Sequence, residues 1–460
     1  MSELIYMKSQ RNKTILYSEG FAYNESGVLK GLKRYRCRQR SCYGKILVSS
    51  SNEVTELTPH NHLGDAQKIM AEVSAKKIKD RALETTEAPR SVVANVLRDL
   101  NESERLETPK LKSMRDSVTK ARNKEFGNLN VLVQHGNISE ASKLNSRGHP
   151  FIIFDSRVDA NERYLIFCSE NQKSYLEKSD IWIIDGTFKC VPSNFVQLVC
   201  IRGLILGKSY PLAFLVLTSK KESLYLDAFR FLHGSINFSQ PKHIIVDFER
   251  ALINALKNTF TESNMHGCLF HFSQSIWRKI QSFGLVQDYK RKKDIFEIYK
   301  KCMYLVFFPD EEIYSNFQAF KRYFYSKPVS GSCKRFLQYF ENTYILESEH
   351  SYPVKFWSCY QRITSEIPRT TNSSEAWHAS LNRQTLLSNP SMAKLFEVLK
   401  SEEDITAFSL TRLFNGRDIP VAKCDYKKEF QLRQICMNRE HFNNDSYCEA
   451  LQNVYKFKTN

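Results

Sequence analysis

The sequence of 460 residues has no long apolar run and no sign of a secretory signal. Its longest apolar stretches, such as 211–217, are far shorter than a membrane-spanning helix requires. Residues 1–8 lack the apolar core of a signal sequence. Internal repeats and long low-complexity tracts are also missing. The sequence therefore predicts a soluble, intracellular protein that does not associate with a membrane.

The cysteines show no disulfide pattern. There are 12, scattered along a chain that is long enough to bury a core without covalent cross-links. We expect most of them to be buried thiols and any clustered ones to be metal ligands. The length predicts roughly two to four structural units, and the 42% of hydrophobic residues is typical of globular proteins.

Acidic residues are in deficit. The chain has 50 Asp and Glu against 67 Lys and Arg, which gives a formal net charge of +17. Such an excess favours a polyanionic partner, and nucleic acid is the leading interpretation. A membrane surface is the alternative, but no long basic helix with an aromatic face supports it.

Four metal-ligating side chains lie near the N-terminus, spaced as C-x4-C and H-x-H. Two cysteines on a tight knuckle and two histidines on one face of a strand are able to close a tetrahedral Zn²⁺ site. The surrounding segment has few large aliphatic residues, so a structural metal would supply stability that its core lacks. The alternative is two ordinary thiols near two surface histidines. The predicted zinc ligands are Cys37, Cys42, His60 and His62.

Basic residues surround this cysteine pair, and no acidic residue occurs between Glu25 and Glu53. Such a patch is suited to a phosphate backbone, and the interleaved tyrosines are suited to stacking on bases. The residues of this segment that are predicted to bind DNA are Lys33, Arg34, Arg36, Arg38 and Arg40.

Residues 10–62 resemble a FLYWCH-type zinc finger. Tyr35 stands where the family usually has Trp, but a large aromatic side chain remains. Such modules bind DNA or protein partners, so the resemblance implies a binding role and favours DNA. It is carried by Phe21, Tyr23, Tyr35, Arg36, Cys37, Cys42, His60 and His62.

Residues 66–130 change to a helical pattern that ends in a basic helix, for which Pro109 is suited to the first position. A short helical cluster of this kind is compatible with a helix-turn-helix, in which Lys112 and Arg115 would contact DNA. The alternative is a solvated linker helix with its basic residues on the wet face.

Residues 150–275 show an α/β pattern, with a hairpin turn predicted at Gly207-Lys208. Three successive strands, a helix, a strand, a helix and a strand are the order of a ribonuclease-H-like sheet. The predicted strands of this series are 181–184, 196–206, 210–218, 243–246 and 266–270.

Three acidic residues, Asp185, Asp247 and Glu375, stand at positions that suit a metal site. Two follow central strands, and the third lies on a helix that would cross the sheet. Each alone has an ordinary explanation: a hairpin turn, a helix N-cap and a capping box. Together they suit phosphodiester cleavage, because hard oxygen ligands hold the two Mg²⁺ or Mn²⁺ ions that such chemistry uses. In this hypothesis Asp185 bridges the ions, and each of the other acids completes the shell of one ion.

The motifs around these acids resemble the transposase domain of Mutator-like elements (MULE) over residues 150–400. They are Ile184–Phe188, Val246–Glu249, Cys268–Phe272 and Thr371–His378. The resemblance implies a ribonuclease-H-like fold with a helical insertion, on which the three acids are the DDE triad. For the Cys–His pair a buried thiol beside a core histidine is the alternative. The resemblance places three further residues near the active site: Cys268, His271 and His378.

The predicted organisation is therefore multidomain. It comprises a FLYWCH-type finger at 8–65, a helical domain at 66–130, a ribonuclease-H-like MULE domain at 150–275 and 365–400, a helical insertion at 276–364 and a C-terminal segment without an assigned role at 401–460.

The predicted function is that of a DNA transposase, or of a protein derived from one, in the nucleus. We expect it to bind double-stranded DNA such as terminal inverted repeats, to cleave and join strands, and to form a homo-oligomer. A domesticated, non-catalytic transcriptional regulator is the alternative, and a protein-interaction module is a third hypothesis. The basic run 290–293 suits nuclear import, although a solvated helix face explains it equally well.

Overall fold

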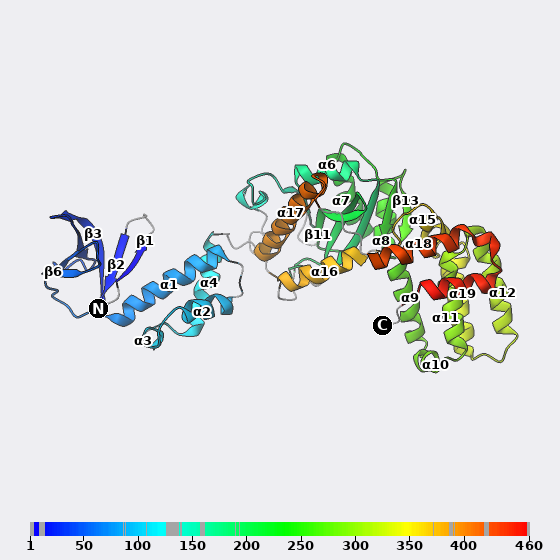
Figure 1. Ribbon diagram of the computed structural model, residues 1–460, viewed down its shortest axis with the longest axis horizontal. Coiled ribbons are helices and arrows are strands. Elements are labelled where there is room, and N and C mark those ends of the chain that lie inside the picture. The colour runs from blue at the N-terminus through cyan, green and yellow to red at the C-terminus, as the bar shows by residue number, and fades with distance from the viewer. Residues whose placement is uncertain are drawn as a thin grey trace. The chain divides into compact units, whose positions relative to one another are not determined.

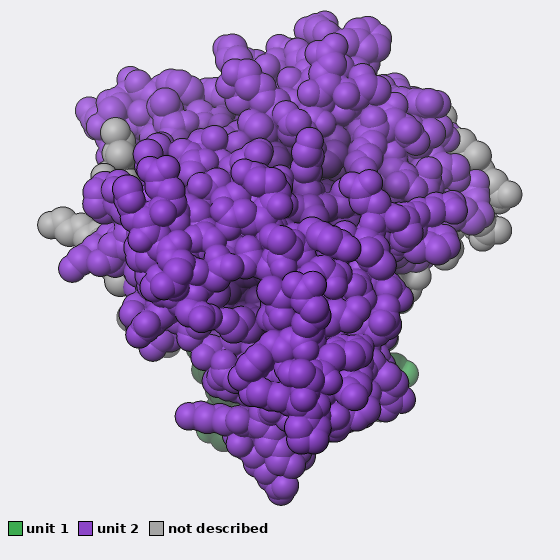
Figure 2. Space-filling view, turned by 90° about the vertical axis from the view of Figure 1, so that its right-hand side faces the viewer, with its two compact units in different colours: residues 1–129 green, residues 130–460 purple. Residues whose placement is uncertain are grey.

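The chain divides into two compact units, residues 1–129 and 130–460, which Figure 2 distinguishes by colour. None of the helices in the described residues combines the length and hydrophobicity that a membrane crossing requires. The computed structural model describes residues 4–8, 14–85, 87, 89–106, 108–125, 138, 140–156, 162–188, 190–192, 194–370, 372–385, 390, 392–417 and 423–457.

The first unit begins with a six-stranded antiparallel sheet whose strands follow chain order (Figure 1). Alternate side chains of the central strands point inwards, so that Tyr23, Tyr35 and Ile46 form a small core. The β3–β4 hairpin closes at Lys30 and Gly31, which both have positive φ, as a tight two-residue turn requires. The strands are β1 (Ile5–Lys8), β2 (Thr14–Ser18), β3 (Phe21–Leu29), β4 (Leu32–Cys37), β5 (Lys45–Val48) and β6 (Val54–Thr58).

Within the described residues of the first unit, four helices follow the sheet: α1 (Ala66–Glu84), α2 (Pro89–Arg98), α3 (Glu102–Leu106) and α4 (Leu111–Glu125). Asp65 caps α1 by accepting a hydrogen bond from the backbone of Lys68. Val73 packs against Ile15 and Tyr17 of the sheet. Further along, α1 joins α2 and α4 in a second core, so α1 belongs to both cores. This second core contains Ile78, Ala82, Val92, Val93, Val96, Met114, Val118 and Ala121.

The second unit is built on a mixed seven-stranded sheet of order β13-β12-β9-β10-β11-β8-β7. The neighbouring strands of the series β9-β10-β11-β8-β7 are antiparallel to one another, whereas β12 is parallel to both β9 and β13. The β10–β11 hairpin turns at Leu206-Gly207, one residue before the predicted position, and both residues have positive φ. The strands are β7 (Ile152–Asp155), β8 (Tyr164–Phe167), β9 (Ile181–Thr187), β10 (Gln197–Ile205), β11 (Lys208–Leu217), β12 (His243–Val246) and β13 (Asn264–Gly267).

Helices cover both faces of this sheet. On one face α7 (Glu222–Ser235) and α8 (Arg250–Thr259) pack on apolar side chains such as Ile184 and Val246. On the other face lie α16 (Asn372–Thr385) and the first part of α17 (Met392–Phe414). There Trp377 stacks on Phe214, and Phe396 contacts Phe167. A short helix, α6 (Glu170–Lys178), packs beside β10 and β11.

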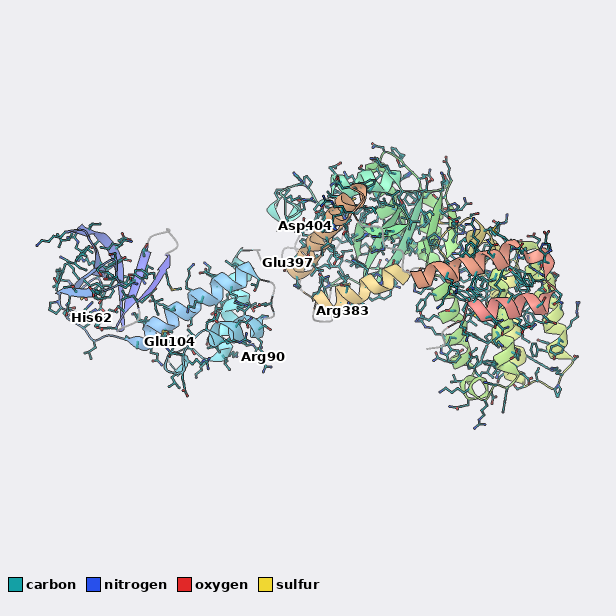
Figure 3. All side chains as sticks on the ribbon, in the orientation of Figure 1. His62, Arg90, Glu104, Arg383, Glu397 and Asp404 are labelled. Atoms are coloured by element: carbon teal, nitrogen blue, oxygen red, sulfur yellow. The ribbon has the colours of Figure 1, made fainter. Side chains whose placement is uncertain are left out.

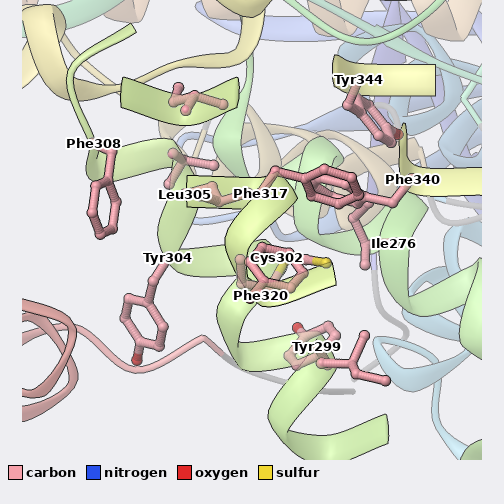
Figure 4. Packing of buried hydrophobic residues seen from close by; sticks show 14 of the residues in the cluster. Ile276, Tyr299, Cys302, Tyr304, Leu305, Phe308, Phe317, Phe320, Phe340 and Tyr344 are labelled. Atoms are coloured by element: carbon pink, nitrogen blue, oxygen red, sulfur yellow. The ribbon is translucent and has the colours of Figure 1, made fainter. Parts of the chain in front are cut away.

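The remainder is helical and has its own aromatic core, part of which Figure 4 shows. The two C-terminal helices contribute Leu432 and Tyr447 to this core, so they pack on the helices of the insertion. The helices are α9 (Leu269–Ser282), α10 (Val286–Lys290), α11 (Asp294–Tyr304), α12 (Asp310–Tyr325), α13 (Gly331–Phe340), α14 (Val354–Trp357), α15 (Tyr360–Thr364), α18 (Lys423–Met437) and α19 (Asn444–Val454), with 3-10 turns at Leu305–Phe307, Glu140–Lys143 and Arg439–His441 and a π-helical turn at Glu341–Ile345.

The strand predicted at 266–270 is wrong in its extent. The structure ends β13 at Gly267 and begins α9 at Leu269. The predicted strand thus joined the end of β13 to the first residues of α9. From Leu269 onwards the apolar residues follow helical spacing and are buried on one side of α9. The buried residues of α9 are Leu269, Phe272, Ile276 and Ile280.

Candidate metal centres

The four predicted zinc ligands lie together, although they come from separate parts of the finger. Their ligand atoms are all within 4.8 Å of one another. Sγ of Cys37 is 3.4 Å from Nε2 of His62, and Sγ of Cys42 is 3.3 Å from Nδ1 of His60. A tetrahedral Zn²⁺ with sulfur at ~2.3 Å and nitrogen at ~2.0–2.1 Å has S···N edges of about 3.5 Å. The donor set and the distances between the sulfur and nitrogen atoms therefore fit a Zn²⁺ ion.

Neighbouring groups orient the two histidines. The hydroxyl of Tyr23 lies 2.9 Å from Nε2 of His60, and the ring of Phe21 stacks on His60 with centroids 3.7 Å apart. Nδ1 of His62 lies 3.0 Å from the backbone oxygen of the next residue, which leaves Nε2 to face a cysteine. Metal-binding histidines are commonly held through the second ring nitrogen in this way.

The surroundings of Cys42 and His60 favour their metal-binding protonation states, whereas burial raises the pKa of Cys37. Burial raises the pKa of Cys42, but hydrogen bonds from the backbone of Asn61 and Gly44 outweigh it and the pKa is lowered overall. Burial lowers the pKa of His60 and so favours the neutral ring. Gly44 is needed for close approach, since a Cβ there would lie 2.7 Å from Nδ1 of His60.

The predicted DNA-binding residues of the finger differ in their surroundings. Arg36 of β4 is exposed and is the register partner of Lys45 of β5. Arg34 donates to the backbone oxygen of Ser26 at 3.0 Å. Arg38 forms an ion pair of 3.0 Å with Glu72 of α1, so part of its charge is neutralised within the unit. The remaining two are exposed: Lys33 and Arg40.

Lys112 and Arg115 are exposed on α4, three residues apart and hence on one side of the helix. Met114 and Val118 of the same helix are buried in the core of the bundle. The basic side of α4 is therefore turned away from the core of its own unit.

Asp185 and Asp247 lie side by side near the carboxyl ends of the neighbouring parallel strands β9 and β12. The residues immediately before them are register partners. Two positions earlier, Ile183 and Ile245 share one buried cluster, so both aspartates point to that same face. Asp185 is 3% exposed. Burial also raises the pKa of Asp247, and the charge of His271 opposes this shift.

A cysteine and two histidines surround the aspartates. Nδ1 of His378 lies 3.6 Å from Oδ2 of Asp185. Cys268 is buried immediately before α9, which places His271 in the first turn of that helix. Burial lowers the pKa of His271, but Cys268 and the two aspartates outweigh it and raise the pKa to about 9. Burial and nearby positive charges lower the pKa of His378 to about 4. One cationic and one neutral imidazole therefore face the acids at neutral pH.

Glu375 lies in α16, three residues before His378, and its side chain is outside the described part of the structure. The structure thus brings together Asp185, Asp247, Cys268, His271 and His378, and it places the helix that carries Glu375 against their face of the sheet.

The sequence did not predict a polar network on the other side of β9. The hydroxyl of Tyr225 lies 2.5 Å from Oε1 of Gln197 and 2.9 Å from Oε1 of Glu249, which pairs with Lys220 at 2.8 Å. A Cβ on Gly186 would lie 2.0 Å from Nε2 of Gln197. The network ties β9 and β10 to α7 and to the start of α8. No spacing in the sequence signals it, because strand register and helix packing bring these residues together.

Comparison with known proteins agrees with the two resemblances found in the sequence. Residues 6–62 match the family model of the FLYWCH zinc finger domain, and residues 181–275 match that of the MULE transposase domain. The two matches occur in the predicted order and confirm both resemblances. No match was found among curated proteins.

Among solved structures, the Drosophila P element transposase strand transfer complex shares 9% identity with this chain. The alignment covers 73% of this chain and 91% of that chain, with a TM-score of 0.28. A TM-score this low supports no conclusion on fold or function.

Proposed function

We propose that this protein is a DNA transposase of Mutator-like type, or is derived from one, and that its second unit cleaves and joins DNA strands. The observation that carries the proposal is the pair Asp185 and Asp247, placed side by side on one face of the sheet within the segment that matches the MULE transposase domain. The strand order and directions of β9 to β13 support a ribonuclease-H-like fold.

The donor set suits divalent cations. Two adjacent carboxylates provide hard oxygen ligands, and Glu375 on α16 is the proposed third ligand. When bound, two Mg²⁺ or Mn²⁺ ions would activate the attacking oxygen and stabilise the leaving oxygen of a phosphodiester. The chain itself holds the ligands on rigid elements, partly excludes water around Asp185, and supplies the cationic His271 beside the acids.

We further propose that the first unit binds double-stranded DNA, with terminal inverted repeats as the expected target and the nucleus as the site of action. The finger presents Lys33, Arg36 and Arg40 at its surface, and α4 presents Lys112 and Arg115. The proposed domains keep the ranges predicted from the sequence, although α17 runs across residue 400 without a break.

The purified full-length chain tests the proposal when it is incubated with labelled duplex DNA in Mg²⁺, Mn²⁺, Ca²⁺ or a chelator. Strand cleavage that leaves 3′-hydroxyl ends in Mg²⁺ or Mn²⁺ only is the expected result. DNA binding without cleavage in any of these ions would contradict the catalytic proposal and favour a non-catalytic regulator.

Replacement of Arg36 by alanine is expected to weaken binding to duplex DNA of any sequence, because an exposed arginine on the finger would contact phosphate rather than bases. Loss of one phosphate contact lowers the slope of log affinity against log salt by about 0.9. Fluorescence anisotropy at several salt concentrations measures this slope. Lys355→Ala, which removes an exposed lysine of the second unit, is the control for net charge. An unchanged slope in Arg36→Ala would exclude this face of the finger from the DNA interface.

A further inference from the structure

Glu402 is a buried carboxylate on α17 that holds two side chains of α16. It is 6% exposed. Its Oε2 accepts a hydrogen bond of 2.6 Å from Nε1 of Trp377, and its Oε1 accepts one of 2.8 Å from Nε2 of Gln384. The two donors are seven residues apart, so they lie on one side of α16, two turns apart. Both oxygens of Glu402 therefore bind the same helix.

We propose that Glu402 is a positioning residue that fixes α16, and with it Glu375, over the aspartates of β9 and β12. This inference rests on the proposed function of these three acids. We refer to Trp377, Gln384 and Glu402 as the Glu402 clamp.

The helix that supplies Glu402 is itself anchored. The next residue, Glu403, is fully buried and accepts hydrogen bonds from Ser169 at 2.9 Å and Arg147 at 2.5 Å. Phe396 of α17 contacts Phe167 of β8. These contacts hold α17 to the sheet. Because Glu402 of α17 binds α16, it fixes the position of α16 relative to the sheet.

The clamp acts on the turn of α16 that matters for metal binding. Trp377 stacks on Phe214 of β11 with ring centroids 5.7 Å apart, and the next residue, His378, contacts Asp185. Glu375 precedes Trp377 by two residues and so belongs to the same helical turn. A shift of about 1 Å in a reacting group is able to cost on the order of 100-fold in rate, so small movements of this turn have large effects.

A buried arginine of β10 lies near Glu402. Arg202 is 6% exposed. Burial lowers its pKa, and the nearby Glu402 and Asp185 oppose this shift. Arg202 donates to the side chain of Ser209 at 2.8 Å and to its backbone oxygen at 2.6 Å. The hydrogen bonds from Trp377 and Gln384 occupy both oxygens of Glu402, as a buried carboxyl group requires.

The test compares wild type, Glu402→Gln, Trp377→Phe and Gln384→Ala as full-length proteins. Glu402→Gln keeps the volume but replaces one acceptor by a donor, and Trp377→Phe keeps an aromatic ring but removes the N–H. Mn²⁺ titration followed by electron paramagnetic resonance measures metal binding, and thermal unfolding measures stability. We expect the Mn²⁺ concentration for half-saturation to rise by about 10-fold or more in Glu402→Gln and Trp377→Phe, as for other groups that orient metal ligands.

The control is Glu397→Gln on the same helix, where the side chain is 46% exposed. Figure 3 labels Glu397 and Asp404 on α17 and Arg383 on α16. A clamp variant that unfolds at a lower temperature but titrates with Mn²⁺ like wild type would overturn the inference and leave only a structural role. If Glu402→Gln does not fold, the same comparison of Mn²⁺ titration with thermal unfolding is made on Gln384→Ala. Gln384 is partly exposed, so we expect this variant to fold. The wild type should bind Mn²⁺ at a site that is lost in Asp185→Asn. If no such site is found, both the proposed function and the proposed role of the Glu402 clamp are wrong.

Discussion

Replacing Asp185 by asparagine is expected to reduce Mg²⁺-dependent strand cleavage by on the order of 1000-fold, which corresponds to about 4 kcal/mol of lost transition-state stabilisation. The substitution removes the charge of the proposed bridging ligand but keeps its shape. Oδ1 of Asp185 accepts a hydrogen bond of 2.9 Å from the backbone of Gly186, and an asparagine oxygen is able to accept the same bond. The fold should therefore survive. Cleavage of a labelled duplex, with thermal unfolding measured in parallel, separates the two effects.

Asp180→Asn is the matched control. Asp180 immediately precedes β9, but its side chain is 64% exposed and pairs with Lys242 at the surface. We expect wild-type cleavage from this variant. Equal activities of Asp185→Asn and wild type would contradict the assignment of Asp185 as a metal ligand, whereas unfolding of Asp185→Asn would show a structural role instead.

Replacing Cys42 by serine is expected to unfold the finger. The core of the finger is small. Cys37 and Cys42 belong to this core and are also two of the four proposed zinc ligands. Structural zinc supplies about 10–16 kcal/mol of apparent binding free energy in zinc-finger peptides, which is more than such a core provides. Hydrogen exchange resolved along the chain should show loss of protection in β3 to β5 while β9 to β12 remain protected. Loss of zinc, measured by atomic absorption, should accompany it.

Tyr43→Ser is the control for this prediction, because Tyr43 adjoins the ligand and is 70% exposed. Chelation of zinc from the wild type should reproduce the exchange pattern of Cys42→Ser. Persistent protection of β3 to β5 after metal removal would show that the finger folds without zinc.

The sequence was informative where local patterns carry the chemistry. The C-x4-C and H-x-H spacings predicted a metal site because ligand types and strand periodicity are local properties, and the structure brings these four ligand atoms together. The resemblances to the FLYWCH and MULE families were likewise readable from short motifs, and the family matches confirm them. The catalytic role of Asp185 and Asp247 remains a prediction, supported by their placement on adjacent strands.

The sequence was less informative where an apolar run suits both a strand and a helix. Residues 266–270 satisfy both patterns over so few positions, and packing against the helical core decided for a helix from Leu269. Similarly, nothing in the sequence distinguishes Arg38 from Arg36. Only the fold shows that Arg38 pairs with Glu72, 34 residues further along the chain.

The amino-acid sequence by itself thus determined the order of the elements, the likeness to the two families and the candidate ligands. Only the tertiary structure decided which side chains share a face of the sheet and which groups hold them there. Glu402 illustrates the difference, since its partners Trp377 and Gln384 are 25 and 18 residues away in the sequence. Hydrogen bonds between separate helices depend on how the helices pack on the sheet, and a linear spacing does not encode that packing.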